Sequence, residues 1–439
     1  MSRIVILGAG MSGFGAAHRL HSQGVKPVLY EKSPFHGGHT ASFRFEPGFT
    51  FDVGPHVSFT KNPYIQELFA KSVNGEYETV RYNLNNYWQG YWIAHPAHCK
   101  LFGLPPQLIV EIVKDFVASQ YSGERAINNY EDWLIASYGE KFARTFPMEY
   151  NLKYWTTDAR NMTTDWLGPR MYRPKLEEVL FGAVSPVTPN IHYVQEFRYP
   201  RRNGFGSYLN MFVSEPDLHL GHQVTRIDPK KKILEFANGK QDIYAGLISS
   251  LPLPDLIPLI EGVPSDVVDA VNLLACSSCV LVNIGVDRDD VSDAHVSYFY
   301  DRDICFSRLN FPHNMSRNNV PPGKSSIQAE VYYSRKYKPL DGDPADYVDL
   351  VLTDIRKTGL LRPDDRILYS DYSDVPYANV IFDLDRGKAL ATVHGYLDNT
   401  GIAYCGRYGR WGYIWTDEAF VSGEEAAQQV LDKDLVTRR

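Results

Sequence analysis

The apolar residues at the start of the chain follow the pattern of a buried strand, a turn and a helix. Residues 4–7 are four consecutive apolar residues, which is typical of a parallel strand covered on both faces. A helical pattern continues through Leu20, and residues 27–30 form a second strand that ends at Glu31. This strand–helix–strand order predicts an α/β fold built on a parallel sheet.

The rest of the chain alternates between helical and β patterns. Residues 62–195 have a helical pattern and are rich in Trp and Tyr, with Asn129 in a helix-capping position. Residues 219–256 alternate between turns at 228–229 and 238–239, which predicts a β-meander. Further strands are expected at 247–250, 280–286, 295–300, 304–311, 327–333 and 402–405, and helices at 346–358 and from about 417 to 429.

Three glycines fill the turn between the first strand and the helix with the spacing G-x-G-x-x-G. Gly8 permits the tight turn, Gly10 lets the backbone approach a pyrophosphate, and Gly13 lets helix and strand pack closely. The helix N-terminus offers free N–H groups to phosphates, and Glu31 can accept hydrogen bonds from a ribose diol. Glycines are common in turns, but in this order they predict dinucleotide binding.

The residues after Glu31 favour FAD among the dinucleotides. An NAD dehydrogenase usually continues directly into another helix, whereas residues 32–45 contain the pair Gly37–Gly38 followed by Thr40 and Ser42. A glycine pair followed by small hydroxyl residues resembles the FAD-binding enzymes of the amine oxidase and UDP-galactopyranose mutase group. The alternative is an ordinary polar loop.

Length and composition fit an enzyme of several domains. A chain of 439 residues with 44% hydrophobic residues can bury a large core. The net charge of −7 provides no basic footprint, so nucleic acid is not expected as a partner. No apolar run approaches the ~20 residues of a membrane span, and the first strand begins within three residues, so we expect no signal peptide and a cytoplasmic protein.

The five cysteines indicate neither a disulfide framework nor a metal site. Cys276 and Cys279 match the spacing CxxC, but a zinc site needs a second pair of ligands. They stand immediately before an apolar run, which favours a buried structural role. No metal is therefore expected.

Three stretches resemble UDP-galactopyranose mutases, especially the eukaryotic branch, within the larger FAD amine oxidase and protoporphyrinogen oxidase fold group. The first is DVGPHVSFT at 52–60, and the second is YNLKYWTTDARNMTTDWLGPRM at 150–171. The third is CGRYGRWGY at 405–413. A weaker match, at 298–311, has a tyrosine ten residues before an arginine.

The resemblance implies a Rossmann-like FAD-binding domain that the chain leaves and re-enters. We expect this domain to be assembled from residues 1–61, 198–255 and 395–439. The substrate domain would be discontinuous, with a helical part at 62–197 and a mixed β-sheet part at 256–394.

The resemblance also implies roles for individual residues. His56 would lie beside the flavin ring, and Arg308 and Arg407 would bind the substrate diphosphate, which makes these three the candidate catalytic residues. The candidate FAD-binding residues are Gly8, Gly10, Ser12, Gly13, Glu31, Lys32, Gly38, His39, Thr40, His56, Val224, Gly406, Arg407, Asp417 and Ala419. The candidate substrate-binding residues are Tyr154, Trp155, Tyr298, Arg308, Tyr377, Arg407 and Tyr413, and for Tyr377 core packing is an equal alternative.

The activity implied by the resemblance is that of a sugar-nucleotide mutase. N5 of reduced FAD would attack the anomeric carbon of a nucleotide sugar, most simply a UDP-sugar, so that pyranose and furanose forms interconvert; NAD(P)H is the candidate reductant. One alternative is an FAD-dependent oxidoreductase of the amine oxidase group that acts on an amine or another small molecule. Another is a non-enzymatic protein of this fold that escorts lipid-anchored proteins. The oligomeric state is not predicted.

Overall fold

A five-stranded parallel sheet forms the first body of the protein. The computed structural model describes residues 3–121, 123, 126–188 and 191–437. The strand order is β19-β13-β1-β2-β9, and every pair is parallel. The strands are β1 (Ile4–Leu7), β2 (Val28–Tyr30), β9 (Asp217–His219), β13 (Gly246–Ser249) and β19 (Ile402–Tyr404). The predicted α/β fold with a parallel sheet is therefore confirmed.

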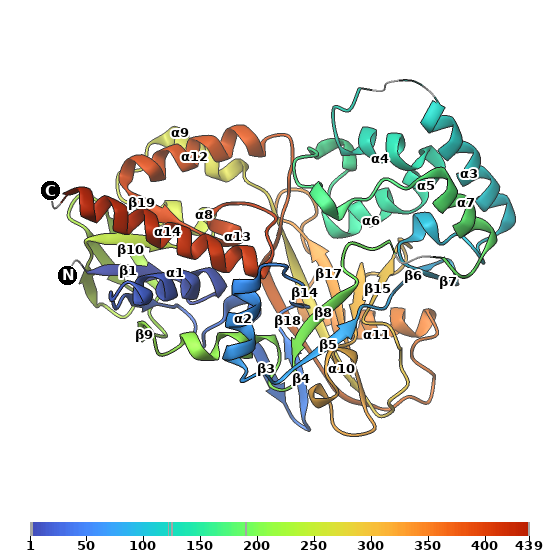
Figure 1. The fold of residues 1–439 in the computed structure, drawn as a ribbon, viewed down its shortest axis with the longest axis horizontal. Coiled ribbons are helices and arrows are strands. Elements are labelled where there is room, and N and C mark those ends of the chain that lie inside the picture. The colour runs from blue at the N-terminus through green and yellow to red at the C-terminus, as the bar shows by residue number, and fades with distance from the viewer. Residues whose placement is uncertain (1–2, 122, 124–125, 189–190, 438–439) are drawn as a thin grey trace.

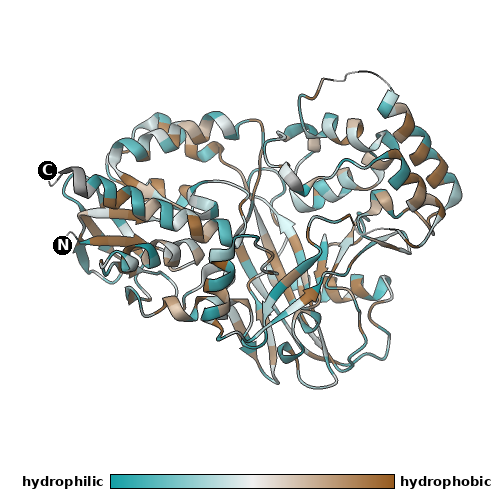
Figure 2. Ribbon diagram, in the orientation of Figure 1, coloured by the Kyte–Doolittle hydropathy of each residue, from teal (hydrophilic) through white to brown (hydrophobic). Residues whose placement is uncertain are grey.

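Two long helices from opposite ends of the sequence lie together against this sheet. Helix α1 (Met11–Ser22) follows the glycine turn, and α14 (Thr416–Thr437) ends the described chain. Figure 1 shows α1 and α14 side by side, with α9 (Ser265–Leu273) and α12 (Arg386–Thr400) near β19. Figure 2 shows that the parallel strands are apolar while the outer helices have mixed surfaces.

A separate antiparallel meander packs beside the parallel sheet. Its strands β10 (Val224–Asp228), β11 (Ile233–Phe236) and β12 (Gln241–Ile243) pair in sequence order. The turn after Asp228 is held by hydrogen bonds from the backbone N–H groups of Lys230 and Lys231 to the Asp228 carboxylate. The meander expected from the alternation is confirmed.

A seven-stranded sheet forms the second body, with the order β18-β14-β17-β16-β15-β6-β7. Its strands are β6 (Leu84–Trp88), β7 (Tyr91–Ala94), β14 (Cys276–Val286), β15 (Val296–Phe299), β16 (Arg308–Asn310), β17 (Ser325–Tyr333) and β18 (Ile367–Val380). Strand β14 begins at Cys276, so the CxxC residues are part of the strand, and both cysteines are free thiols. The long strand β18 was not expected from the sequence. Helix α11 (Tyr347–Lys357), which was expected, packs against this sheet.

A third group consists of helices that lie beside the seven-stranded sheet, at the upper right of Figure 1. They are α3 (Pro106–Tyr121), α4 (Tyr130–Tyr138), α5 (Glu140–Thr145), α6 (Pro147–Tyr154) and α7 (Leu176–Val184). As expected, Asn129 caps α4, because its side chain accepts a hydrogen bond from the backbone N–H of Asp132 at 3.0 Å. No described helix has the length and apolar character needed to cross a membrane.

The expectation that residues 62–197 are helical is wrong for part of that range. After α2 (Pro63–Ser72), residues 77–94 form β5 (Tyr77–Arg81), β6 and β7. Strand β5 pairs with β8 (Glu196–Pro200), and β6 pairs with β15, more than 200 positions later. Partners so distant in sequence leave no local signal, and the strand preference is decided by tertiary packing. The expected β-sheet part, 256–394, likewise includes α9 and α12, which pack together near β19.

We predict that the contact between α1 and α14 tolerates no side chain. A Cβ atom at Gly423 would stand 1.9 Å from the carbonyl oxygen of Ser12, and one at Gly15 would stand 2.1 Å from that of Phe420. Gly423→Ala should therefore lower the free energy of unfolding by about 1–3 kcal/mol, measured by urea denaturation. The control is Gly395→Ala in α12, where no atom lies within 4 Å of the new Cβ. This control should be neutral or stabilising by up to about 1 kcal/mol. Equal stability of the two variants would contradict the prediction.

Candidate functional site

One large cavity, of about 1020 Å³, lies where the three bodies meet. Its walls include the glycine turn after β1, residues of α6, residues of the seven-stranded sheet, and the segment from Arg407 to Ala419. The cavity thus begins at the carboxyl end of the parallel strands, where ligands of open α/β sheets bind.

The glycine turn is shaped by three distinct constraints. Gly8 has φ +95°, and its N–H donates to the carbonyl of Tyr30 at 2.8 Å. A Cβ at Gly13 would stand 1.9 Å from the carbonyl oxygen of Gly8, so this glycine allows the helix to pack against the turn. At Gly10, in contrast, the nearest atom to a Cβ would be the Gly37 oxygen at 4.0 Å. A side chain at Gly10 would therefore occupy cavity space and not clash with protein.

The carboxylate of Glu31 joins the glycine turn to the segment that follows β2. One oxygen accepts a hydrogen bond from the N–H of Ala9 and the other from that of Ser33, both at 2.9 Å. A carboxylate has about four acceptor positions, so capacity for a ribose diol is left. Glu31 and Lys32 both line the cavity.

The glycine pair after Glu31 closes the same end of the cavity. The N–H of Gly37 donates to the carbonyl of Ala9 at 2.7 Å, and Gly37 and Gly38 have φ values of +105° and +54°. Thr40 then bonds back to the Gly37 carbonyl at 2.8 Å. The left-handed backbone explains why two glycines stand here.

Most of the predicted FAD residues line the cavity. Those that do are Gly8, Gly10, Ser12, Glu31, Lys32, Gly38, His39, Thr40, His56, Val224, Arg407 and Ala419. Gly13, Gly406 and Asp417 are not part of the cavity wall. Gly406 instead lies behind it, because a Cβ there would stand 2.4 Å from the Ser12 hydroxyl. The open space above Gly10, the carboxylate of Glu31 and the N-terminus of α1 fit a dinucleotide such as FAD.

Two histidines in the cavity wall, His39 and His56, are held in the neutral form. Burial is the main cause that lowers the pKa of His56 to about 4 and that of His39 to about 3. The positive charge of Arg407 contributes in the same direction. Both side chains are partly exposed, and both line the cavity. A contact of 3.0 Å between its Nδ1 and the carbonyl oxygen of Gly54 orients the His56 ring.

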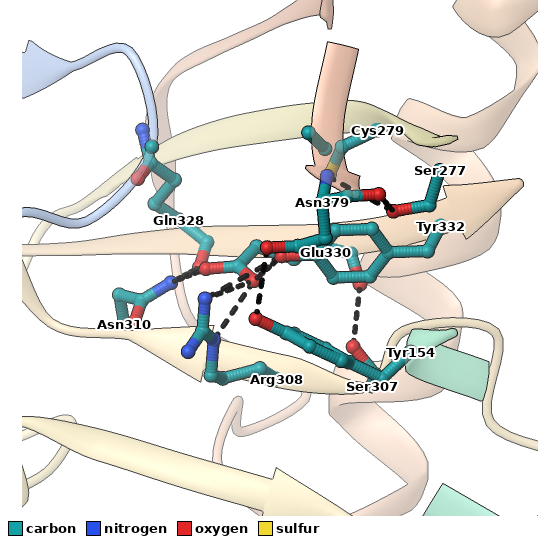
Figure 3. Close-up of polar contacts among 12 residues, drawn as sticks. Tyr154, Ser277, Cys279, Ser307, Arg308, Asn310, Gln328, Glu330, Tyr332 and Asn379 are labelled. Atoms are coloured by element: carbon teal, nitrogen blue, oxygen red, sulfur yellow. Dashed lines mark hydrogen bonds and ion pairs between the residues drawn. The ribbon is translucent and has the colours of Figure 1, made fainter. Parts of the chain in front are cut away.

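Arg308 lies in the cavity wall but forms an ion pair with a buried carboxylate. Its Nε and one terminal nitrogen approach the same oxygen of Glu330 at 2.8 and 2.7 Å, as Figure 3 shows. Glu330 is fully buried and also accepts from Asn310 at 2.6 Å and from Tyr332 at 2.5 Å. The charge of Arg308 is therefore balanced inside the protein, a pairing that was not predicted from the sequence.

Arg407 keeps its positive charge uncompensated. Its guanidinium donates to the carbonyl of Ile414 at 2.8 and 3.2 Å, to Asn379 Oδ1 at 3.2 Å and to the carbonyl of Ala378 at 3.4 Å. These partners are neutral oxygens, and among the described residues it has no carboxylate partner. Its charge is available to an anion in the cavity.

A second arginine with neutral partners lies close by. Arg170 donates to the carbonyl of Tyr413 at 2.6 Å and has its guanidinium 4.8 Å from the Tyr413 ring and 4.6 Å from the Trp415 ring. Such stacking on aromatic faces favours the cation. Arg170 lies in the motif at 150–171, but it was not predicted to be a site residue.

All four tyrosines predicted to bind substrate line the cavity. Tyr298 lies directly opposite Arg308 in the antiparallel pair of β15 and β16. Tyr154 and Tyr413 have their hydroxyl oxygens 3.1 Å apart, and the Trp155 ring lies 5.2 Å from that of Tyr413. Tyr377 also lines the cavity, but its hydroxyl donates to Asp255 at 2.5 Å.

Asn379 and Glu330 are site residues that sequence reasoning missed. Asn379 lies on β18, two residues after Tyr377, and its Oδ1 accepts from both Tyr154 and Arg407. Glu330 lies on β17, opposite Arg308 in the ladder. A signal existed for Glu330, since a charged residue inside the apolar run at 327–333 is expected to be paired. The sequence contains no comparable signal that Asn379 belongs to the site.

The fold and the cavity define a flavoprotein, and the comparisons with known proteins agree. Residues 11–431 match the family of flavin-containing amine oxidoreductases, and the chain belongs to this family. The protein is similar over its whole length to the crystal structure of reduced UDP-galactopyranose mutase, at 27% identity and a TM-score of 0.92, covering 98% of this chain and 96% of that one.

Two further similarities are either low in sequence identity or limited to a short stretch of the chain. An oxidoreductase from Methanosarcina mazei shares the fold at 14% identity and a TM-score of 0.63, covering 97% of this chain and all of that one. A 68-residue stretch is 38% identical to 15-cis-phytoene desaturase of Glycine max, but the match spans 16% of this chain and 12% of that enzyme.

We predict that a side chain at Gly10 removes the flavin without unfolding the protein. Gly10→Val would fill the space where the backbone approaches a pyrophosphate, while the nearest protein atom to the new Cβ is 4.0 Å away. The purified variant should lack the flavin absorption at about 450 nm and keep its circular dichroism. Gly387→Ala, at an open position in α12, is the control and should keep both. Full flavin content in Gly10→Val would contradict this assignment.

We predict that the neutral histidines make the fold less stable in acid. His56 has a pKa of about 4 in the folded protein, below the value of about 6.5 expected when unfolded. Between these values the unfolded chain binds more protons, so the free energy of unfolding should fall as the pH is lowered from 6.5 to 4. His56→Asn should make this dependence less steep, measured by urea titration at several pH values. An unchanged slope would show that His56 is protonated in the folded protein.

Proposed function

We propose that the protein is a flavin-dependent sugar-nucleotide mutase that interconverts pyranose and furanose forms of a UDP-linked sugar. The observation that carries this proposal is the likeness, over 98% of the chain, to reduced UDP-galactopyranose mutase. The charges that line the cavity supply independent support.

The charge balance of the cavity suits an anionic substrate. Arg170 and Arg407 have neutral partners, whereas Arg308 is paired with Glu330. A guanidinium fork binds phosphate oxygens bidentately and does not lose its charge near neutral pH. A diphosphate placed between Arg170 and Arg407 would balance both charges.

The residues around this position would orient the sugar and exclude water. Tyr154, Trp155 and Tyr413 form an aromatic wall beside Arg407. Neutral His56 lies where the glycine-rich end of the cavity meets the arginines, and it would contact the flavin without adding a positive charge. Bound FAD in its reduced state would supply a nucleophilic nitrogen for covalent catalysis at the anomeric carbon.

Oxidation of an amine or another small molecule is the second candidate, because the chain belongs to the amine oxidoreductase family. Of the three carboxylates in the described cavity wall, Glu330 is paired with Arg308, whereas Glu31 and Asp255 accept hydrogen bonds from neutral N–H and O–H groups. Glu31 lies at the glycine turn, where a dinucleotide ribose is expected. Asp255 is therefore the candidate partner for a cationic amine.

We predict nucleotide-sugar isomerisation that requires reduced flavin. With dithionite or NADPH under anaerobic conditions, the protein should interconvert UDP-galactopyranose and UDP-galactofuranose with no net consumption of reductant. The reaction, followed by chromatography, should stop in air. Oxygen uptake with stoichiometric hydrogen peroxide, and no isomerisation, would instead identify an oxidase.

Substitution of Arg407 tests its contact with the substrate, in a measurement of UDP-sugar affinity by isothermal titration calorimetry. Arg407→Ala should weaken binding of the UDP-sugar about tenfold or more, because a charge-assisted hydrogen bond contributes about 1.5–3 kcal/mol. The flavin spectrum should be retained. Arg410→Ala is the matched control, because Arg410 forms an ion pair with Glu425 on α14 and does not line the cavity. Equal affinity of the two variants would remove Arg407 from the substrate site.

A further inference from the structure

The orientation of the Asn379 side-chain amide follows from its partners. Oδ1 lies 3.2 Å from a terminal nitrogen of Arg407 and 3.2 Å from the hydroxyl of Tyr154. A guanidinium can only donate hydrogen bonds, so the atom that faces Arg407 must be the amide oxygen. The amide nitrogen Nδ2 is therefore on the other side of the group.

This nitrogen has no partner within the described protein. No described residue accepts a hydrogen bond from Nδ2, although Asn379 is 96% buried, as its exposed fraction of 4% shows. Nδ2 is also not enclosed, in contrast to the unpartnered ring nitrogen of buried Trp411. Because Asn379 lines the cavity, the N–H₂ group is left beside Arg407 as a donor at the cavity surface.

The tyrosines next to it are oriented by the same hydrogen bonds. Tyr154 has one hydroxyl proton, and it donates that proton to Asn379. The hydroxyl of Tyr413, 3.1 Å from that of Tyr154, must then donate to Tyr154. In this arrangement Tyr413 presents lone pairs to the cavity and offers no proton to an anion.

We propose that Asn379 contacts the substrate, with its side-chain N–H₂ group donating to a diphosphate oxygen held by Arg407. This proposal rests on the proposed function, since it takes the ligand to be a nucleoside diphosphate sugar. Arg407 supplies the charge, and Asn379 supplies a neutral donor that is fixed in direction because its oxygen is bound twice. Figure 3 shows Asn379 next to Tyr154, near the Arg308–Glu330 pair.

The test compares two substitutions that differ in what they remove. Asn379→Asp keeps an oxygen for Arg407 and Tyr154 but replaces the donor by a second oxygen, whereas Asn379→Ala removes the whole amide. UDP binding is measured by isothermal titration calorimetry on the flavin-loaded protein. We expect about tenfold weaker binding for Asn379→Ala. For Asn379→Asp we expect a larger loss, because its carboxylate would balance Arg407 and repel the phosphates.

The control is Asn283→Ala. Asn283 has the same exposed fraction of 4%, lies in the same sheet on β14, and is not part of the cavity wall. This variant should bind UDP as the wild type does. If Asn379→Ala also binds UDP as the wild type does, the side chain makes no contact to the diphosphate, and the proposal is overturned.

A second probe separates this proposal from the proposed function. If the wild type binds inorganic pyrophosphate but neither UDP nor UDP-sugars, the mutase proposal fails. Loss of pyrophosphate binding in Asn379→Ala, with binding retained in Asn283→Ala, would then still support the contact to a diphosphate. Unchanged pyrophosphate binding in Asn379→Ala, or no binding of either probe by the wild type, would overturn it.

Discussion

The close backbone contact between α1 and α14 is the constraint on which the cavity depends. Gly15 and Gly423 leave no room for a side chain between the helices, so two segments 400 positions apart are held at a fixed distance. The contact continues behind the cavity wall, where Gly406 lies against Ser12 and its N–H donates to the Ser422 hydroxyl at 2.9 Å. Arg407 is the next residue. The glycine turn that suits a pyrophosphate and the arginine that suits a substrate anion are thereby placed in one wall.

Electrostatic compensation then decides which arginine can act on a ligand. A buried carboxylate left alone would be very unfavourable, so Glu330 needs the charge of Arg308 and the hydrogen bonds of Asn310 and Tyr332. Arg407 and Arg170 are satisfied by carbonyl oxygens and aromatic faces, which stabilise a cation without cancelling its charge. An anion that enters the cavity therefore finds two available charges and one that is already balanced.

The structure agrees with the sequence where the evidence is local. The turn from Gly8 to Gly13, the acid Glu31 and the pair Gly37–Gly38 all lie between positions 8 and 38, and their spacing reflects backbone conformation. The stretch at 77–94 was misjudged because its strands pair with β8 and β15. Strand β18 was missed although it is the longest described strand, since its exposed edge and Pro376 weaken the usual alternation.

The sequence by itself determined the dinucleotide-binding turn, the α/β class and the family resemblance, because these depend on short-range conformation and on motifs that remain contiguous. Only the tertiary structure decided the state of each charged group. Arg308 is neutralised by a carboxylate 22 positions away, and the Asn379 amide is oriented by Tyr154 and Arg407, which both donate to its Oδ1. Charge and hydrogen-bond direction depend on which partners the fold brings within about 3 Å, and no spacing along the chain encodes that distance.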